Sequence, residues 1–195
     1  VSNAAGITGG NPTSTNGASK KASYVTFNGT NQFFYKDTTT NINGGISQFN
    51  TNTGTIHVWV QPTNVLGTTS RFIFDYAGYY GLAIESSNSS ALDKIKFYGS
   101  SLGNSPQFTT SLASVGMTYY MISVTFQPSG TCTVYVDGSS IGTFTSSAFT
   151  APSSTNYLTI GCNSARTSFW NGGIGAVLFY NVLQSSTTVQ QVYNY

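Results

Sequence analysis

The strongest constraint on the fold is a repeated pattern of short alternating runs, each ended by a turn dipeptide. The stretch TVYVDGSSIGTF, residues 133–144, alternates apolar and polar side chains, breaks at Asp137-Gly138 and then resumes. Alternation with a period of two is typical of a strand with one buried face, and Asp-Gly between two such runs favours a tight hairpin turn. We therefore predict a β-hairpin here, with Asp137 as a turn residue rather than a catalytic one.

Runs of the same kind recur along most of the chain, and Asn-Gly pairs such as Asn28-Gly29 and Asn171-Gly172 separate several of them. The further strand candidates are SYVTFN, QFFYK, TIHVWVQ, RFIFDY, YYGLAIE, KIKFYG, YYMISVTF, TCTVYVD, SIGTFT, YLTIG and IGAVLFY. Many short strands at this spacing predict an all-β fold, a two-sheet antiparallel jelly-roll sandwich, rather than βαβ units.

The two ends of the chain differ from this pattern. Residues 1–19, VSNAAGITGGNPTSTNGAS, are polar and without periodicity, so we predict a flexible arm or linker there and one sandwich domain over residues 20–195. The tail SSTTVQQVYNY predicts a short helix, with Ser185 or Ser186 as its N-cap and with Val189 and Val192 on one face.

Composition excludes some classes of function and favours others. Only 6% of the residues are charged, and the seven basic residues are scattered, so a groove for nucleic acid has little electrostatic support. No apolar run has the length of a membrane span. A surface rich in Ser, Thr, Asn and Gly is typical of extracellular, cell-surface and virion-surface β proteins, and we expect such a location.

The two cysteines share one predicted environment. Cys132 lies on the same strand face as Val134 and Val136, and Cys162 shares a face with Leu158 and Ile160. Both sulfur atoms therefore point into the apolar layer. The sequence leaves two alternatives open, a buried disulfide between Cys132 and Cys162 or two inert core thiols.

No arrangement of residues predicts catalysis. No two acidic residues stand at the i, i+2 or i+4 spacing that would place two carboxylates on one strand for glycoside hydrolysis. The sole histidine, His57, lies within a strand and shares a face with Trp59, which favours a structural role. We predict no catalytic residue, no cofactor and no metal site, although a weak calcium site using Asp75 or Asp93 with backbone carbonyls stays open.

Six motifs follow one another along the chain: YVTFNGTNQFF, TIHVWVQP, YYMISVTF, TVYVDGSSIGTF, LTIGCNS and FWNGGIGAVLFYNVLQSSTTVQQVYN. Taken in this order, they resemble the concanavalin A-like lectin/glucanase superfamily, in its laminin-G/pentraxin-like branch, and the resemblance covers roughly Ser23 to Tyr195. The resemblance implies a jelly roll closed by a short C-terminal helix, with ligands held by rim loops or one concave sheet face. Pentraxin-like relatives often carry an Asp near the end of the first strand. Here Asn28 and Asn31 occupy that region, which puts calcium binding in doubt.

Two stretches carry the side chains that suit a carbohydrate site. Sugar recognition uses aromatic rings together with planar amides or arginine. The segment from Asp75 to Tyr80 places tyrosines around a glycine turn, and the loop after Cys162 combines arginine, tryptophan and asparagine. The candidate ligand-binding residues are Tyr79, Tyr80, Asn163, Arg166, Trp170 and Asn171.

These observations lead to one functional prediction and two alternatives. We predict a non-enzymatic surface recognition module that binds a glycan or a protein partner, as in an adhesin, an appendage or a virion-surface protein. The first alternative is a structural building block that assembles with itself or with a capsid or fibre lattice and has no soluble ligand. The second is a polysaccharide-cleaving enzyme whose carboxylates meet only in the folded chain.

Overall fold

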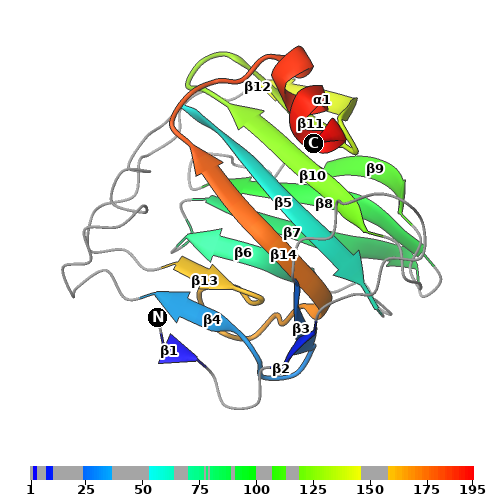
Figure 1. Cartoon of the computed structure of the whole chain (residues 1–195), viewed down its shortest axis with the longest axis vertical. Helices are drawn as coiled ribbons and strands as arrows, with labels where there is room; N and C mark the ends of the chain where they lie inside the picture. Colours follow the sequence, from blue (N-terminus) through cyan, green and yellow to red (C-terminus); the bar gives the residue numbers. More distant parts are fainter. Residues whose placement is uncertain are drawn as a thin grey trace.

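Two seven-stranded antiparallel sheets pack face to face in the computed structural model of the chain (Figure 1). The structure describes residues 2–3, 8–10, 24–36, 53–63, 70–76, 78, 80–88, 91–99, 107–112, 119–145 and 158–195. The back sheet contains, in spatial order, β1 (Ser2–Asn3), β4 (Phe34–Lys36), β13 (Leu158–Ile160), β6 (Arg71–Tyr76), β7 (Tyr80–Asn88), β8 (Ala91–Gly99) and β9 (Gln107–Leu112). The front sheet contains β12 (Ser139–Thr145), β11 (Thr131–Val136), β10 (Tyr120–Phe126), β5 (Gly54–Pro62), β14 (Asn171–Tyr180), β3 (Tyr24–Asn28) and β2 (Thr8–Gly10). This arrangement confirms the predicted jelly-roll sandwich.

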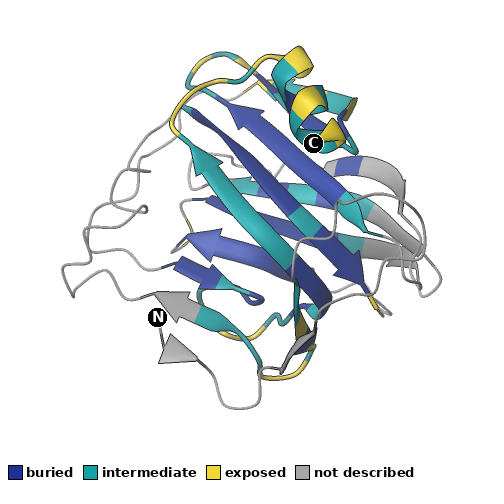
Figure 2. Cartoon of the chain, viewed as in Figure 1, coloured by how far each residue is buried: buried dark blue, intermediate teal, exposed yellow. Residues whose placement is uncertain are grey.

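The core lies between the two sheets and follows from the alternation of side chains. In β5, Ile56, Val58 and Val60 are fully buried and belong to the central apolar cluster. The back sheet contributes Phe74, Leu82 and other large side chains to the same cluster. Figure 2 shows β5 and β10 as almost entirely buried strands, which means that their outer faces are covered as well.

The C-terminal segment provides that cover for the front sheet. Helix α1 (Ser186–Asn194) is preceded by its N-cap residue, Ser185. The side-chain oxygen of Ser185 accepts a hydrogen bond from the Thr188 amide. Val189 is fully buried against Met121 and Tyr135, in a second apolar cluster outside the central one. The predicted C-terminal helix is confirmed, and its apolar side closes the outer face of the sheet. No helix in the described part of the chain is long and apolar enough to cross a membrane.

Hydrogen bonds of His57 connect the C-terminal segment to the front sheet. Its Nδ1 lies 2.7 Å from Ser123 Oγ and its Nε2 lies 2.8 Å from Gln184 Oε1. Thr55 adds two further bonds, because its hydroxyl donates to the Val182 carbonyl at 2.8 Å and accepts from the Gln184 amide at 3.0 Å. His57 is fully buried on the face opposite Ile56, so it has the structural role that the sequence favoured.

The buried His57 predicts a loss of stability in mild acid. Burial lowers the pKa of His57 below its ordinary value of 6.5, although the hydrogen bond to Gln184 opposes the shift. The folded chain therefore holds the ring neutral, while the unfolded chain takes up a proton as the pH falls through about 6.5. We expect His57 to make its full contribution to the free energy of unfolding above that pH. At lower pH the free energy of unfolding is expected to decrease, by up to about 1.4 kcal/mol per pH unit.

Urea unfolding at about pH 7.5 and about pH 5.5 measures this effect. Because His57 is the only histidine in the chain, a His57→Gln variant is the natural control. Its stability is expected to be lower at neutral pH and to change less between the two pH values. An equal loss in both proteins would assign the acid sensitivity to other groups.

The cysteines and the hairpin resolve two questions that arose from the sequence. Cys132 in β11 and Cys162 after β13 are buried free thiols, which favours the core-thiol alternative over a disulfide. Burial raises the pKa of Cys162 to about 12, so this thiol is protonated and inert at neutral pH. Asp137 and Gly138 both have positive φ, at 50° and 78°, and form the tight turn between β11 and β12. Asp137 also accepts a hydrogen bond from the Met121 amide at 2.8 Å, which confirms its structural role.

Two short stretches near the N-terminus pair with strands of the sandwich. Ser2 and Asn3 pair with β4, and residues 8–10 pair with β3, so these short strands extend one edge of each sheet. Backbone pairing at an open sheet edge needs no apolar pattern, and the flexible arm over residues 1–19 stays a prediction. The other residues of the segment 1–19 lie outside the described part of the chain.

Candidate functional site

The loop of residues 161–170 joins β13 to β14 and is held closed at its base. The Gly161 amide donates to the Ile73 carbonyl at 2.8 Å, and the Trp170 amide donates back to the Gly161 carbonyl at 2.8 Å. Within the loop, Asn163 Oδ1 accepts hydrogen bonds from the amides of Thr167 at 2.8 Å and Ser168 at 3.1 Å. The side-chain oxygen of Asn163 is thus committed to shaping the loop.

Two residues that the sequence placed in a ligand site are buried instead. Trp170 is 0% exposed and donates from Nε1 to the Gly173 carbonyl at 3.2 Å, so it anchors the loop in the core. Tyr80 is also 0% exposed, and its ring packs against Phe126 with centroids 5.1 Å apart. Neither ring faces solvent, and the prediction of ligand contact is corrected at both positions. Tyr79 lies outside the described residues.

Other side chains form a partly exposed cluster at the same loop. Arg166 lies over the ring of Phe33, with its guanidinium carbon 5.4 Å from the ring centroid. The rings of Phe33 and Phe169 have centroids 6.2 Å apart and are tilted by 42°. Arg71 donates from Nη1 to the Phe169 carbonyl at 3.3 Å. We call these four residues, Phe33, Arg71, Arg166 and Phe169, the arginine–phenylalanine patch.

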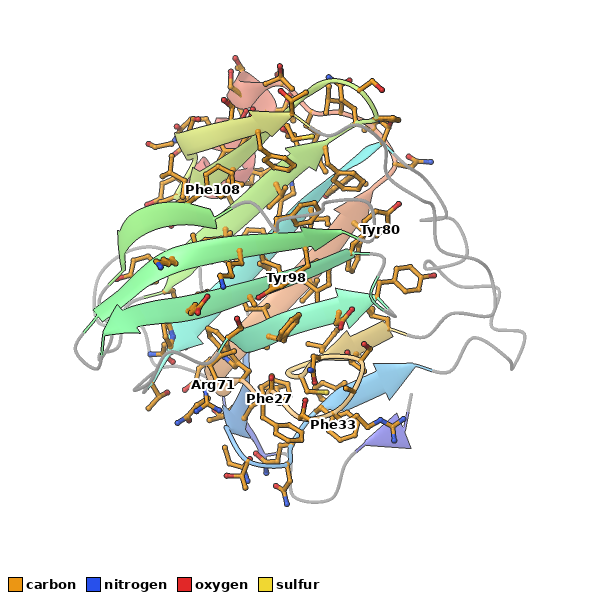
Figure 3. All side chains as sticks on the ribbon, turned by 180° about the vertical axis from the view of Figure 1, so that it is seen from behind. Phe27, Phe33, Arg71, Tyr80, Tyr98 and Phe108 are labelled. Carbon is orange, nitrogen blue, oxygen red and sulfur yellow. The ribbon has the colours of Figure 1, made fainter. Side chains whose placement is uncertain are left out.

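The patch lies on one rim of the sandwich. Figure 3, which views the molecule from behind, places Arg71 at the start of β6 and Phe33 beside β4, both toward the same end of the molecule. Arg166 is exposed, and the other three residues are partly exposed. Rings and cations from three separate segments therefore meet at a surface that solvent reaches.

Local structure fixes the parts of this patch. Arg166 has a left-handed backbone with φ 57°, and its amide donates to the Asn163 carbonyl at 2.9 Å. In the facing turn, Asn28 Oδ1 accepts from the amides of Thr30 at 3.0 Å and Asn31 at 3.2 Å. Asn171, a predicted ligand residue, pairs with Asn28 between β14 and β3. Asn171 thus joins the two loops at their base.

Sequence reasoning found Arg166 but missed its partners. Phe33 and Phe34 are consecutive, so in an extended chain they point to opposite sides, and Phe34 packs against the central core. That alternation was the available signal that one of the two rings faces outward. Arg71 gave no such signal, because a lone arginine at the start of a strand is ordinary.

The carboxylates that the structure describes form hydrogen bonds or an ion pair within the protein. Asp75 accepts from the Gly78 amide through Oδ1 at 2.7 Å and from the Ser164 amide through Oδ2 at 2.8 Å. Glu85 forms an ion pair with Lys96, and Asp137 accepts a hydrogen bond from the Met121 amide near the start of β10. Among the residues that the structure describes, no three His, Cys, Asp or Glu side chains gather as metal ligands. The side chains of Asp37 and Asp93 lie outside the described part.

Solved structures of other proteins share this fold at low sequence identity. Domain 4 of AbnA, an extracellular arabinanase from Geobacillus stearothermophilus solved with arabinotriose, is 14% identical with a TM-score of 0.61, covering 97% of this chain and 82% of that one. A heptameric SAP-like pentraxin from Limulus polyphemus is 13% identical with a TM-score of 0.59, covering 73% of this chain and 70% of that one. A structure of botulinum neurotoxin type C, described as depending on two ganglioside molecules for cell entry, is 11% identical with a TM-score of 0.63, covering 97% and 46%.

Sequence comparison gives the family directly. None of the curated proteins matches the chain. A family model described as the concanavalin A-like lectin/glucanases superfamily, of the laminin G type, matches residues 19–190. That match covers every strand except β1 and β2, and it ends within the C-terminal helix. The chain belongs to the concanavalin A-like lectin/glucanase superfamily, as a laminin G-type jelly-roll domain.

Proposed function

We propose that this chain is a non-enzymatic recognition module of an extracellular, cell or virion surface, and that it binds a glycan at the arginine–phenylalanine patch. The observation that carries the proposal is the meeting of two phenyl rings and two guanidinium groups on one exposed rim. A sugar offers C–H faces that pack on the negative face of an aromatic ring, and hydroxyl groups that accept hydrogen bonds from arginine.

Proteins of the same fold support this class of ligand. AbnA domain 4 was solved in complex with arabinotriose, and cell entry of botulinum neurotoxin type C is described as dependent on interaction with two ganglioside molecules. These ligands belong to those proteins, and the low identities transfer the fold alone. They support a search among glycans before other ligands.

The engaged carboxylates favour binding over hydrolysis. Glycoside hydrolysis needs two carboxyl groups that reach one scissile bond. Both oxygen atoms of Asp75 accept backbone hydrogen bonds, and Glu85 is paired with Lys96. We also propose that binding needs no metal ion, because the guanidinium groups supply the polar contacts, so a chelator is expected to leave the affinity unchanged.

A glycan array with the 195-residue chain and three variants tests the proposal. Phe33→Ala removes one ring of the patch, and Arg166→Gly removes the cation while keeping a residue that adopts φ 57° without strain. Each is expected to weaken binding about tenfold or more, as truncating a central aromatic or arginine contact commonly does. Tyr98→Ala is the matched control, since it removes a partly exposed ring that is not part of the patch and that contacts Ser70 and Phe72, the neighbours of Arg71 in the chain.

Each alternative result has a distinct meaning. Loss of binding in Tyr98→Ala but not in Phe33→Ala would move the site to the outer face of the back sheet. Binding to no glycan by the unmodified chain would contradict the proposal, and concentration-dependent association of the chain would then favour a structural building block. Circular dichroism and urea unfolding of every variant exclude loss of fold as the cause.

A further inference from the structure

Arg71 presents a charge that the described part of the chain does not neutralise. Its guanidinium donates to a neutral group, the Phe169 carbonyl, at 3.3 Å. In β7, Glu85 follows Ile84, the register partner of Arg71, but the carboxylate of Glu85 forms an ion pair with Lys96 in β8. Arg71 is also partly buried, so a ligand that covers it would remove more of its water. A cation that loses water without gaining a negative partner is costly.

Asp75, further along β6, carries a carboxylate with other partners. Its two oxygen atoms accept from the Gly78 and Ser164 amides, as described above, and it is only 5% exposed. Arg166 places a second guanidinium over the ring of Phe33. The patch therefore combines two cations and two rings. Asp75, the described acidic residue closest to Arg71 in the sequence, bonds backbone amides instead.

We infer that the ligand of the patch is an acidic glycan, with a carboxylate or sulfate group bound by Arg71 and an adjoining sugar packed against the phenylalanine rings. This inference rests on the proposed function and names the class of sugar. The guanidinium group has parallel N–H donors that match the oxygen atoms of a carboxylate or sulfate in pairs. The Arg71 Nη1 group donates a hydrogen bond to the Phe169 carbonyl, and this bond orients the guanidinium group before a ligand binds.

Charge in the ligand gives the binding a measurable signature. Partly exposed ion pairs weaken as salt screens them, whereas packing of a neutral sugar on a ring changes little. The affinity for an acidic oligosaccharide is therefore expected to fall with added salt. The affinity for its neutral counterpart is expected to be weaker and nearly constant.

Titration calorimetry of the full chain with matched oligosaccharide pairs tests the inference. One pair is a uronic acid-containing oligosaccharide and its carboxyl-reduced form, and the other is a sulfated oligosaccharide and its desulfated form. Arg71→Gln removes the charge but keeps an N–H donor for the Phe169 carbonyl. It is expected to weaken binding of the acidic member about 10- to 100-fold and binding of the neutral member much less, since hydrogen bonds to charged groups are the strong ones.

Lys94→Gln is the control for net charge. Lys94 lies in β8, two strands from β6, and is partly exposed like Arg71. An equal loss in Lys94→Gln and Arg71→Gln would overturn the inference, because it would show unspecific attraction. Equal binding of acidic and neutral members, unaffected by Arg71→Gln, would also overturn it while leaving the proposed glycan function in place. Binding of no member of either pair would contradict both. A loss confined to one pair would identify the anion as carboxylate or as sulfate.

Discussion

Replacement of Trp170 by alanine is expected to lower the free energy of unfolding by about 3–5 kcal/mol. Trp170 is the largest fully buried side chain, and its indole N–H bonds the Gly173 carbonyl. Alanine would leave a cavity in the central cluster and a carbonyl without its donor. Since small domains are commonly stable by only about 5–15 kcal/mol, urea unfolding should show a large shift of the midpoint.

A second substitution at this position separates structure from recognition. Trp170→Phe keeps an apolar ring in the core and is expected to cost less than Trp170→Ala. If Trp170 only anchors the loop, the folded Trp170→Phe variant should bind glycan as the unmodified chain does. Loss of binding with intact stability would contradict the burial argument and return Trp170 to the ligand site. A cost of Trp170→Ala near zero would contradict the anchoring role.

The contrast between Trp170 and Phe169 explains what the sequence was able to predict. Strand periodicity predicted the sandwich, the Asp137 turn and the face of His57, because a side chain in a strand points to one of two sides. The same logic predicted a helix after Ser185, where a capping residue precedes a periodic run. Inside a loop no such period exists. Which of two consecutive aromatic residues turns inward depends on distant contacts, here the bond between Trp170 and Gly161.

The composition of the patch shows the same limit. Arg71 and Phe169 are 98 positions apart in the chain, and only the fold brings the guanidinium to the carbonyl. Strand β9 was missed for a related reason. Its sequence QFTTSL carries two apolar residues among hydroxyl side chains, so its pairing with β8 at the sheet edge outweighs a weak local pattern.

Gly172→Ala is expected to destabilise the fold by about 3–5 kcal/mol, through two separate effects. Gly172 has φ 131°, a conformation that residues with a Cβ rarely adopt. A Cβ at this position would also collide with the Gln61 carbonyl oxygen and lie 2.8 Å from the Thr63 amide nitrogen. Both are backbone atoms, one in β5 and the other directly after it, so no side-chain rotation relieves the contact.

Two other glycines in the chain separate these effects. Gly78 also has positive φ, at 79°, but a Cβ there meets nothing within 4 Å, so Gly78→Ala measures backbone strain alone and is expected to cost about 1–2 kcal/mol. Gly173 has no positive φ, and a Cβ would first meet the Tyr24 ring at 3.0 Å. Gly173→Ala is expected to cost less than Gly172→Ala because a side chain can move. Urea unfolding of the three variants measures the order. If Gly172→Ala cost no more than Gly78→Ala, the close approach of β14 to β5 would not be a constraint on the fold.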